Sequence, residues 1–198
     1  MSISRLREFV SDLTDIVSED RPEAAVLEAM RAPMARLLAE DDWLPDAFAQ
    51  PHPDFYQQYL LHCDPKQRFS VVSFVWGPGQ QTPIHDHTVW GMIGMLRGSE
   101  QATRFDVAQP DAMLRATPLR ATQTDVLHEG DIDLVSPTIG DVHQVRNAYD
   151  DRVSISIHVY GANIGRVRRH VYSGETGGVK EFVSGFSSSV LPNLWSPS

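Results

Sequence analysis

The chain has little cysteine, no long apolar run and little positive charge. Its single cysteine, Cys63, cannot form a disulfide within the chain, which fits a reducing cytoplasm. No apolar run approaches the roughly 20 residues of a membrane span, and the first residues lack the basic and apolar regions of a signal peptide. The formal net charge of -9 argues against nucleic-acid or anionic-membrane partners, since phosphate binding needs a basic surface. We therefore expect a cytoplasmic protein with neither kind of partner.

Helical periodicity dominates the beginning of the chain. Apolar residues recur at helical spacing from Leu6 to Ile16, and Pro22 can open a second helix whose apolar stripe runs from Ala25 to Leu38. We expect a short third helix at residues 56–61. Residues 1–66 are thus expected to be mainly helical.

Short β-rich segments separated by turns follow from residue 69 onward. β-branched and aromatic residues fill 69–76, and Gly77-Pro78-Gly79 ends that segment. Further strands are expected at residues 89–96, 101–107, 113–121, 132–135, 144–148 and 153–160. This order favours one domain, an antiparallel barrel or jelly roll at 67–172 with helices at one end. We expect an irregular C-terminal tail at 173–198 that wraps the outside of the barrel.

His85 and His87 stand two residues apart after the turn that ends a strand. Residues two apart on a strand point to the same face, so both imidazoles can converge on one point inside a barrel. On its own the pair fits two partly exposed histidines at a strand start better than a metal site. The surrounding residues change that balance: Gly79 precedes the pair, and Gly91 and Gly98 follow it at a spacing that resembles the first motif of the cupins.

A second set of residues resembles the second cupin motif. It reads Gly130, Pro137, Gly140, His143 and Asn147, with one residue more than usual between Gly130 and Pro137. The resemblance implies a mainly β, cupin-type antiparallel jelly-roll barrel with a helical N-terminal segment. It also implies that His143 joins His85 and His87 at one metal ion.

The ligand set lacks a carboxylate, because Gly91 stands where the cupins usually have a glutamate ligand. Three neutral imidazoles leave a divalent ion with its full charge and with open coordination positions. Oxygen-activating iron more often has two histidines and one carboxylate, and three histidines are also a familiar zinc arrangement. The number of ligands therefore does not decide the identity of the metal.

Short local sequence motifs are more specific than the two cupin motifs. The run from Pro83 to Thr88, Gly91 and the run from Ser156 to Tyr160 together resemble the thiol dioxygenases, the cysteine dioxygenase family, over about residues 56–169. The resemblance implies one Fe(II) per chain on three histidines, and a reaction of a small thiol with O2 that gives a sulfinic acid. It further implies an outer-sphere relay of Ser156, His158 and Tyr160.

The relay has a physical basis apart from the resemblance. Ser156, His158 and Tyr160 alternate along one strand and so face one side. Ser156 can fix the tautomer of His158, which can orient the phenol of Tyr160 toward the metal site or toward a substrate carboxylate. Without the family resemblance, periodicity alone favours a buried, hydrogen-bonded polar cluster with no catalytic role.

Two departures from the animal cysteine dioxygenases bear on this chain. Those enzymes have, where Gly91 stands, a cysteine that cross-links to the relay tyrosine, so we predict an unmodified Tyr160. They also hold the substrate carboxylate with an arginine, where a loose match places Gln58 here. Arg169 is our candidate for the replacement cation, the alternative being a solvated basic cluster. This pattern resembles the bacterial 3-mercaptopropionate dioxygenases.

Three alternatives remain open from the sequence. The chain could be a cysteine dioxygenase, a non-catalytic metal-binding cupin that carries zinc, or a metal-dependent isomerase or hydrolase. A monomer and a small homo-oligomer fit equally well. The remaining histidines are expected to be exposed or ordinarily hydrogen bonded: His52, His62, His128 and His170. Asp86 is expected to point away from the metal. Trp76 and Trp90 are expected to lie in the core or in the wall of a pocket.

Overall fold

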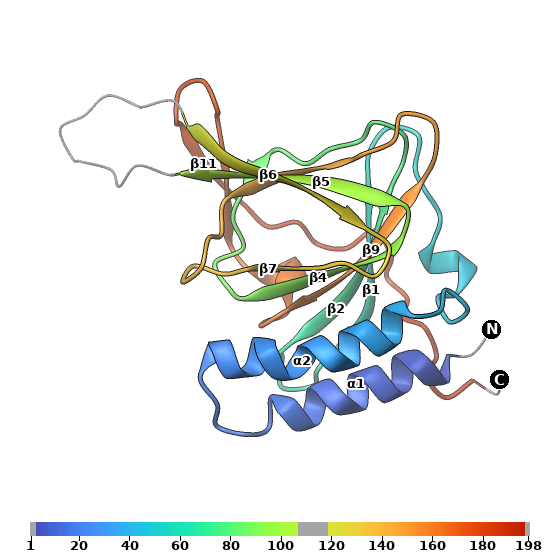
Figure 1. Cartoon of the computed structure of the whole chain (residues 1–198). Coiled ribbons are helices and arrows are strands. Elements are labelled where there is room, and N and C mark those ends of the chain that lie inside the picture. Colours follow the sequence, from blue (N-terminus) through green and yellow to red (C-terminus); the bar gives the residue numbers. More distant parts are fainter. Residues whose placement is uncertain (1–2, 107–118, 197–198) are drawn as a thin grey trace.

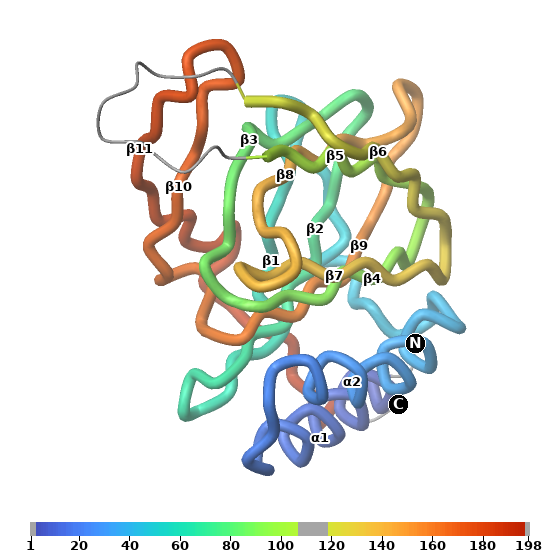
Figure 2. Tube along the Cα trace, turned by 60° about the vertical axis from the view of Figure 1, so that its left-hand side comes forward, coloured from blue at the N-terminus to red at the C-terminus, as the bar shows by residue number. Residues whose placement is uncertain are grey.

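Two antiparallel sheets and two long helices make up the part of the protein that the computed structural model describes, residues 3–106 and 119–196. The sheets enclose a common interior, and the helices lie side by side along the outside of one sheet (Figure 1). The turned view shows the strands arranged around that interior (Figure 2). The predicted mainly β fold, an antiparallel barrel with helices at the N-terminus, is confirmed.

The first sheet lies next to the helices and has the strand order β1-β2-β9-β4-β7. Its strands are β1 (Gln57–Cys63), β2 (Ser70–Trp76), β9 (Ser154–Tyr160), β4 (Gly91–Arg97) and β7 (Ile132–Val135). The second sheet has the order β11-β10-β3-β8-β5-β6. Its strands are β11 (Val179–Phe182), β10 (Arg169–Tyr172), β3 (Ile84–His85), β8 (His143–Asn147), β5 (Ser99–Asp106) and β6 (Arg120–His128).

The helices are α1 (Ser4–Ile16) and α2 (Glu23–Leu38), close to the predicted bounds, and Pro22 precedes the second as its N-cap. Their apolar faces are buried in a cluster that includes Leu6, Met30 and Met34 and continues onto the outer face of the first sheet. Two short 3-10 helices, at Asp46–Phe48 and Ile164–Arg166, complete the helical structure of the described residues.

Strand β9 is buried along its whole length because both of its faces are covered. Ile155, Ile157 and Val159 belong to the cluster shared with the helices. The alternate residues Ser156, His158 and Tyr160 therefore point the other way, into the barrel, where Tyr160 joins the interior cluster. The period of two along β9 thus places three polar groups inside an apolar barrel.

Two expectations on secondary structure are wrong. Residues 57–63 form strand β1 and not a third helix, because alternate residues are buried against the barrel and the backbone pairs with β2. The tail is not wholly irregular, since β11 pairs with β10. Strand β6 was missed, because most of its side chains are polar and exposed. The strand expected at 113–121 lies largely outside the described residues.

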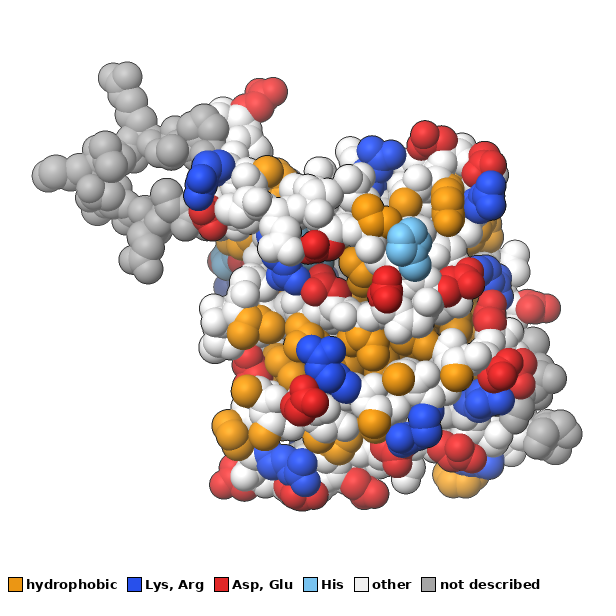
Figure 3. Space-filling model, in the orientation of Figure 1, with side chains coloured by type: hydrophobic (Ala, Val, Ile, Leu, Met, Phe, Trp, Pro, Cys, Tyr) orange, Lys and Arg blue, Asp and Glu red, His pale blue; other side chains and the backbone are white. Residues whose placement is uncertain are grey.

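Charged side chains of both signs are interspersed over the face shown in Figure 3. Apolar side chains gather between the barrel and the helices on that face, and no basic patch is visible among the residues drawn in colour. No helix in the described part of the chain is long and apolar enough to cross a membrane.

Gly94 lets α2 approach β4 closely, which gives a test of the helix–sheet packing. A Cβ atom at this position would lie 2.7 Å from Cδ1 of Leu38 and 2.8 Å from Sδ of Met34. We expect Gly94→Val to lower the free energy of unfolding by about 2 kcal/mol, because the larger side chain overpacks this contact. Urea denaturation followed by circular dichroism measures the change.

The control is Ala121→Val, which adds a similar volume at an exposed position of strand β6. This change is expected to stay within about 0.5 kcal/mol of the unchanged protein. Equal effects of the two substitutions would contradict close packing between α2 and β4.

Candidate metal centre

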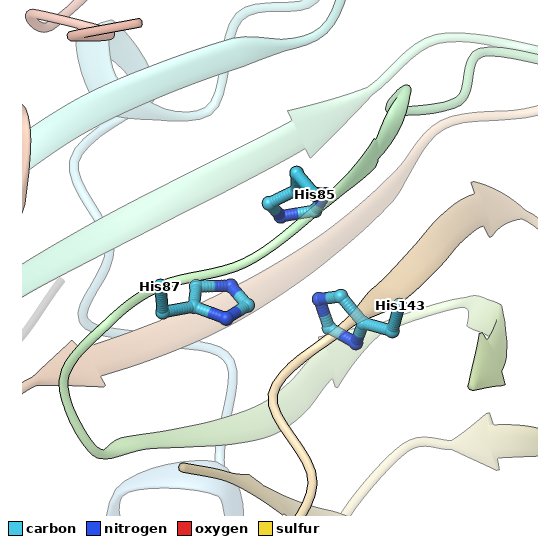
Figure 4. A group of neighbouring side chains, drawn as sticks. All are labelled: His85, His87 and His143. Atoms are coloured by element: carbon cyan, nitrogen blue, oxygen red, sulfur yellow. The ribbon is translucent and has the colours of Figure 1, made fainter. Parts of the chain in front are cut away.

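Three buried histidines meet inside the barrel. His85 on β3 pairs directly with His143 on β8, and His87 follows His85 by two residues. Each pair of imidazole rings has a centroid separation of 4.9 Å, and the potential ligand atoms all lie within 4.8 Å of one another. Figure 4 shows the three rings pointing toward one another. The structure therefore brings together the three residues that the sequence suggested as metal ligands.

Burial keeps the imidazoles of His85 and His143 neutral. Burial, reinforced by the neighbouring His87, lowers the pKa of His85 to about 3 and the pKa of His143 well below its usual value. A neutral imidazole has one nitrogen with a free lone pair, and that nitrogen is the one able to bind a metal.

Hydrogen bonds at Nδ1 determine which nitrogen is free on two of the rings. Nδ1 of His85 lies 3.0 Å from the carbonyl oxygen of Pro83, and Nδ1 of His87 lies 2.9 Å from Oδ1 of Asp141. Each acceptor keeps the proton on Nδ1, so that Nε2 retains its lone pair. Nδ1 of His143 is buried and has no hydrogen-bond partner among the described residues.

Asp141 holds the segment that carries His87. Its Oδ1 also accepts the backbone N–H of His87 at 3.0 Å, and its Oδ2 accepts the backbone N–H of Thr88 at 2.8 Å. Burial acts to raise the pKa of Asp141, but these hydrogen bonds outweigh burial and lower the pKa. Thr88 has φ = 59°, an unfavourable conformation for a β-branched residue. The carboxylate therefore stabilises a strained turn next to a candidate ligand.

The donor set fits a divalent metal ion. Three imidazole nitrogens converge on one point, and hydrogen-bonded acceptors orient two of the rings, as is usual for histidine ligands. Both zinc and ferrous iron accept three imidazoles, so the geometry supports a metal site without choosing the metal.

A chain of hydrogen bonds runs along β9 beside the histidines. The hydroxyl of Ser156 lies 2.8 Å from Nε2 of His158, and Nδ1 of His158 lies 2.8 Å from the hydroxyl of Tyr160. The Tyr160 ring stacks on His87 with a centroid separation of 5.4 Å, which places the phenol next to the three-histidine cluster. Trp76, expected to be core or pocket wall, also donates to Ser156 at 3.2 Å.

A cavity of about 290 Å³ adjoins His85, and both residues suggested for substrate binding, Arg169 and Gln58, line it. Arg169 is 3% exposed, donates to Ser184 at 2.7 Å, and has a buried Nε without a partner among the described residues. Gln58 on β1 also lines the cavity. The lining residues are Tyr56, Gln58, Phe74, Thr82, Pro83, His85, Arg169, Val171, Phe182 and Ser184.

The remaining histidines lie away from the cluster. His52 stacks on Phe55, and His62 lies beside Phe69. His128 is exposed. Asp86 accepts hydrogen bonds from the backbone and Nδ1 of His170 and from Tyr172, so it joins the ligand segment to β10.

Sequence reasoning missed two carboxyl groups in this region, Asp141 and Glu100. Asp141 stands two residues before His143, which hinted at a shared face, but its contact with His87 joins segments 54 residues apart. Glu100 alternates with buried Ala102 on β5, yet a buried glutamate is rare and was not expected there.

Comparison with known proteins identifies a matching family. The sequence model described as "Cysteine dioxygenase type I" matches residues 1–173. Cysteine dioxygenase type 1 of Homo sapiens is 30% identical over 94 residues, 47% of this chain and 44% of the human protein. The Bos taurus protein of the same name is 26% identical over 122 residues, 61% of this chain and 58% of its own length. The chain thus spans about half the length of these relatives.

Solved structures with a similar arrangement are more distant. A Klebsiella pneumoniae protein with a double-stranded β-helix domain has a TM-score of 0.46 and 19% identity, over 64% of this chain and 95% of its own. A cupin superfamily protein from Desulfitobacterium hafniense has a TM-score of 0.45 and 13% identity, over 63% and 94% of the two chains.

Asp141→Asn tests how the ligand segment is held. The amide has only one acceptor oxygen, so it cannot accept hydrogen bonds from both His87 and Thr88 through separate oxygens as the carboxylate does. We expect the affinity for Zn²⁺ to fall about 10- to 100-fold, as for other groups that orient histidine ligands. Competition with a chromophoric chelator measures it.

Asp150→Asn is the matched control, because the Asp150 side chain is 83% exposed. It is expected to leave the Zn²⁺ affinity unchanged. An Asp141→Asn protein that binds Zn²⁺ as tightly as the control would contradict the role given to Asp141.

Proposed function

Because the chain belongs to the cysteine dioxygenase type I family, we propose that it is a metal-dependent thiol dioxygenase. One observation carries the proposal: a three-histidine cluster and a hydrogen-bonded Ser–His–Tyr chain lie side by side in one barrel interior. A purely structural polar cluster would not need three imidazoles with converging nitrogens. We assign the metal to His85, His87 and His143. We propose that the metal is Fe(II), one per chain, because the chain belongs to the cysteine dioxygenase type I family.

The overall reaction balances without an external reductant. A thiol, R–SH, and O2 combine to give a sulfinic acid, R–SO2H, so that sulfur is oxidised and both oxygen atoms enter the product. Ferrous iron bound by the three histidines would supply oxygen activation and an anchor for the substrate sulfur as thiolate.

The surrounding residues orient the substrate and exclude water. Tyr160 is 2% exposed, and its hydroxyl is hydrogen bonded to His158, which Ser156 holds in turn. Burial raises the pKa of Tyr160, so the phenol keeps its proton and can donate a hydrogen bond toward the reacting groups.

The cavity beside His85 suits a small thiol that carries a carboxylate. Arg169 is a buried cation whose Nε has no partner within residues 3–106 and 119–196, and a carboxylate is the group that best satisfies a guanidinium. Gln58 adds an amide donor from β1. No Asp or Glu occurs among the described residues that line the cavity, so no carboxylate there pairs with the ammonium group of cysteine. We therefore propose 3-mercaptopropionate as the favoured substrate.

L-Cysteine is the second candidate substrate, because the named relatives are cysteine dioxygenases. Oxygen uptake by anaerobically prepared, Fe(II)-loaded protein, measured with each thiol separately, distinguishes the two. We expect sulfinate formed in a one-to-one ratio to O2 and a higher kcat/KM for 3-mercaptopropionate. No uptake with either thiol, at confirmed iron content, would favour a non-catalytic metal-binding protein.

Tyr160→Phe tests the relay. The substitution keeps the ring that stacks on His87 but removes the hydroxyl, so we expect kcat to fall about hundredfold, as for the loss of one oriented donor. Tyr149→Phe, in the loop between β8 and β9, is the control. Full turnover and full coupling of O2 use to sulfinate in Tyr160→Phe would rule out the catalytic role.

Arg169→Gln tests carboxylate binding. We expect kcat/KM for 3-mercaptopropionate to fall about 30-fold or more, the loss typical of a charged hydrogen bond. Ethanethiol has no carboxylate, so its kcat/KM should change little. Arg168→Gln is the matched control, since that side chain is 74% exposed. An equal loss for both thiols would indicate a structural defect and not a lost contact with the carboxylate.

A further inference from the structure

Glu100 on β5 is a buried carboxyl group that the metal cluster and the three-residue relay leave unused. It is 2% exposed, and its Oε1 has no hydrogen-bond partner among the described residues. The histidine cluster does not include it. A glutamate in such a place costs stability unless it is neutral or has a specific partner.

The carboxyl group faces the distal end of the relay. Ser156 on β9 and Trp76 on β2 lie beside this carboxyl group. From the adjacent strands, Asn147 on β8 and Leu127 on β6 pair with Glu100 in register. The side chain of Asn147 is occupied by the carbonyl groups of Trp76, Gly77 and Arg152.

The titratable groups around Glu100 are few in the described part of the chain. β9 contributes His158 and Tyr160, further along the relay, and β8 contributes His143. On β6, His128 is exposed, and on β5 itself Arg104 is paired with Asp133 at 2.6 Å. No cation among the described residues is therefore positioned to hold Glu100 in its ionised form, and burial raises its pKa to about 8.

The hydroxyl of Ser156 limits how the chain of hydrogen bonds can run. It has one proton to donate and two lone pairs, and Trp76 donates to one of these at 3.2 Å. One proton and one lone pair remain for two partners, Glu100 and His158. Ser156 therefore donates to one of them and accepts from the other, and the choice sets the direction of the entire relay.

We propose that Glu100 is a fourth member of the relay, a positioning residue that as a neutral acid donates to Ser156 and thereby turns the Tyr160 hydroxyl toward the metal site. With this direction Ser156 donates to Nε2 of His158, and Nδ1–H of His158 donates to the oxygen of Tyr160. The proton of Tyr160 is then free for the substrate side.

Ionisation of Glu100 reverses the direction. The carboxylate can only accept, so Ser156 donates to it, Nε2–H of His158 donates to Ser156, and Tyr160 donates to Nδ1 of His158. The phenol proton then points away from the metal site. Because the raised pKa of Glu100 keeps it protonated at pH 7, the productive direction is present below about pH 8 and is lost as the pH rises above it.

The tautomer of His158 reports this direction and does not depend on catalysis. We would record ¹⁵N spectra of histidine-labelled, Zn²⁺-loaded protein from pH 6 to 9.5, with His158 assigned from a His158→Gln variant. The expected result is the Nδ1–H tautomer at pH 7 and a change to the Nε2–H tautomer near pH 8. In Glu100→Gln the Nδ1–H tautomer should persist to the highest pH, because the amide can donate to Ser156 and does not ionise.

The Nε2–H tautomer at pH 7, or the same change in Glu100→Gln as in the unchanged protein, would overturn the proposal. Should Glu100→Gln fail to fold, ¹³C-carboxyl labelling of glutamate in the unchanged protein gives a second test. One carboxyl resonance should titrate near pH 8, together with the tautomer change. A carboxylate that is already ionised at pH 6 would contradict the assignment.

The effect on turnover rests on the proposed function. For the Fe(II)-loaded protein we expect kcat to fall about tenfold per pH unit above pH 8, with KM for the thiol unchanged. Glu100→Gln should remove this alkaline limb, whereas Glu28→Gln, whose side chain is 77% exposed, should retain it. A tautomer change without turnover would refute the proposed dioxygenase function and leave the proposed relay intact. Turnover without the tautomer change would refute the role proposed for Glu100.

Discussion

The site depends on one constraint: imidazole rings buried inside the barrel must be uncharged. An ionised imidazole would be very costly where His85, His143 and His158 are buried, so these three rings are neutral, and each ring at the site needs defined partners. The carbonyl of Pro83 and the carboxylate of Asp141 supply these partners for two rings. The converging nitrogens that remain are what a divalent metal ion requires.

The same constraint explains why the scaffold is covered on both sides. β9 presents isoleucine and valine to the helices and serine, histidine and tyrosine to the interior, so α1 and α2 remove one face of the sheet from water. The site then lies in an environment of low polarity, where hydrogen bonds and charges act strongly. A small cavity beside His85 and Arg169 leaves room for a substrate.

The regular patterns of the sequence predicted much of this structure. Alternation placed Ser156, His158 and Tyr160 on one face, and helical periodicity gave both helices to within a few residues. The convergence of His143 with the other two histidines came from the family resemblance, because a contact between β3 and β8 depends on strand pairing that spacing alone does not reveal.

The elements and residues that the sequence did not predict also have physical explanations. The run that became β1 is a short apolar segment, and such a segment fits a helix or a strand until its pairing partner is known. β6 is polar on both faces and carries little hydrophobic signal. Asp141 contacts His87 and Glu100 lies beside Ser156, and only tertiary structure brings these residues together.

X-ray absorption at the iron edge, before and after anaerobic addition of 3-mercaptopropionate, tests the central claim most directly. If three histidines hold the metal and leave positions for the substrate, the spectrum shows only nitrogen and oxygen neighbours at first. One sulfur neighbour should then appear with the thiol. A sulfur neighbour already present without thiol, or none after its addition, would contradict the account.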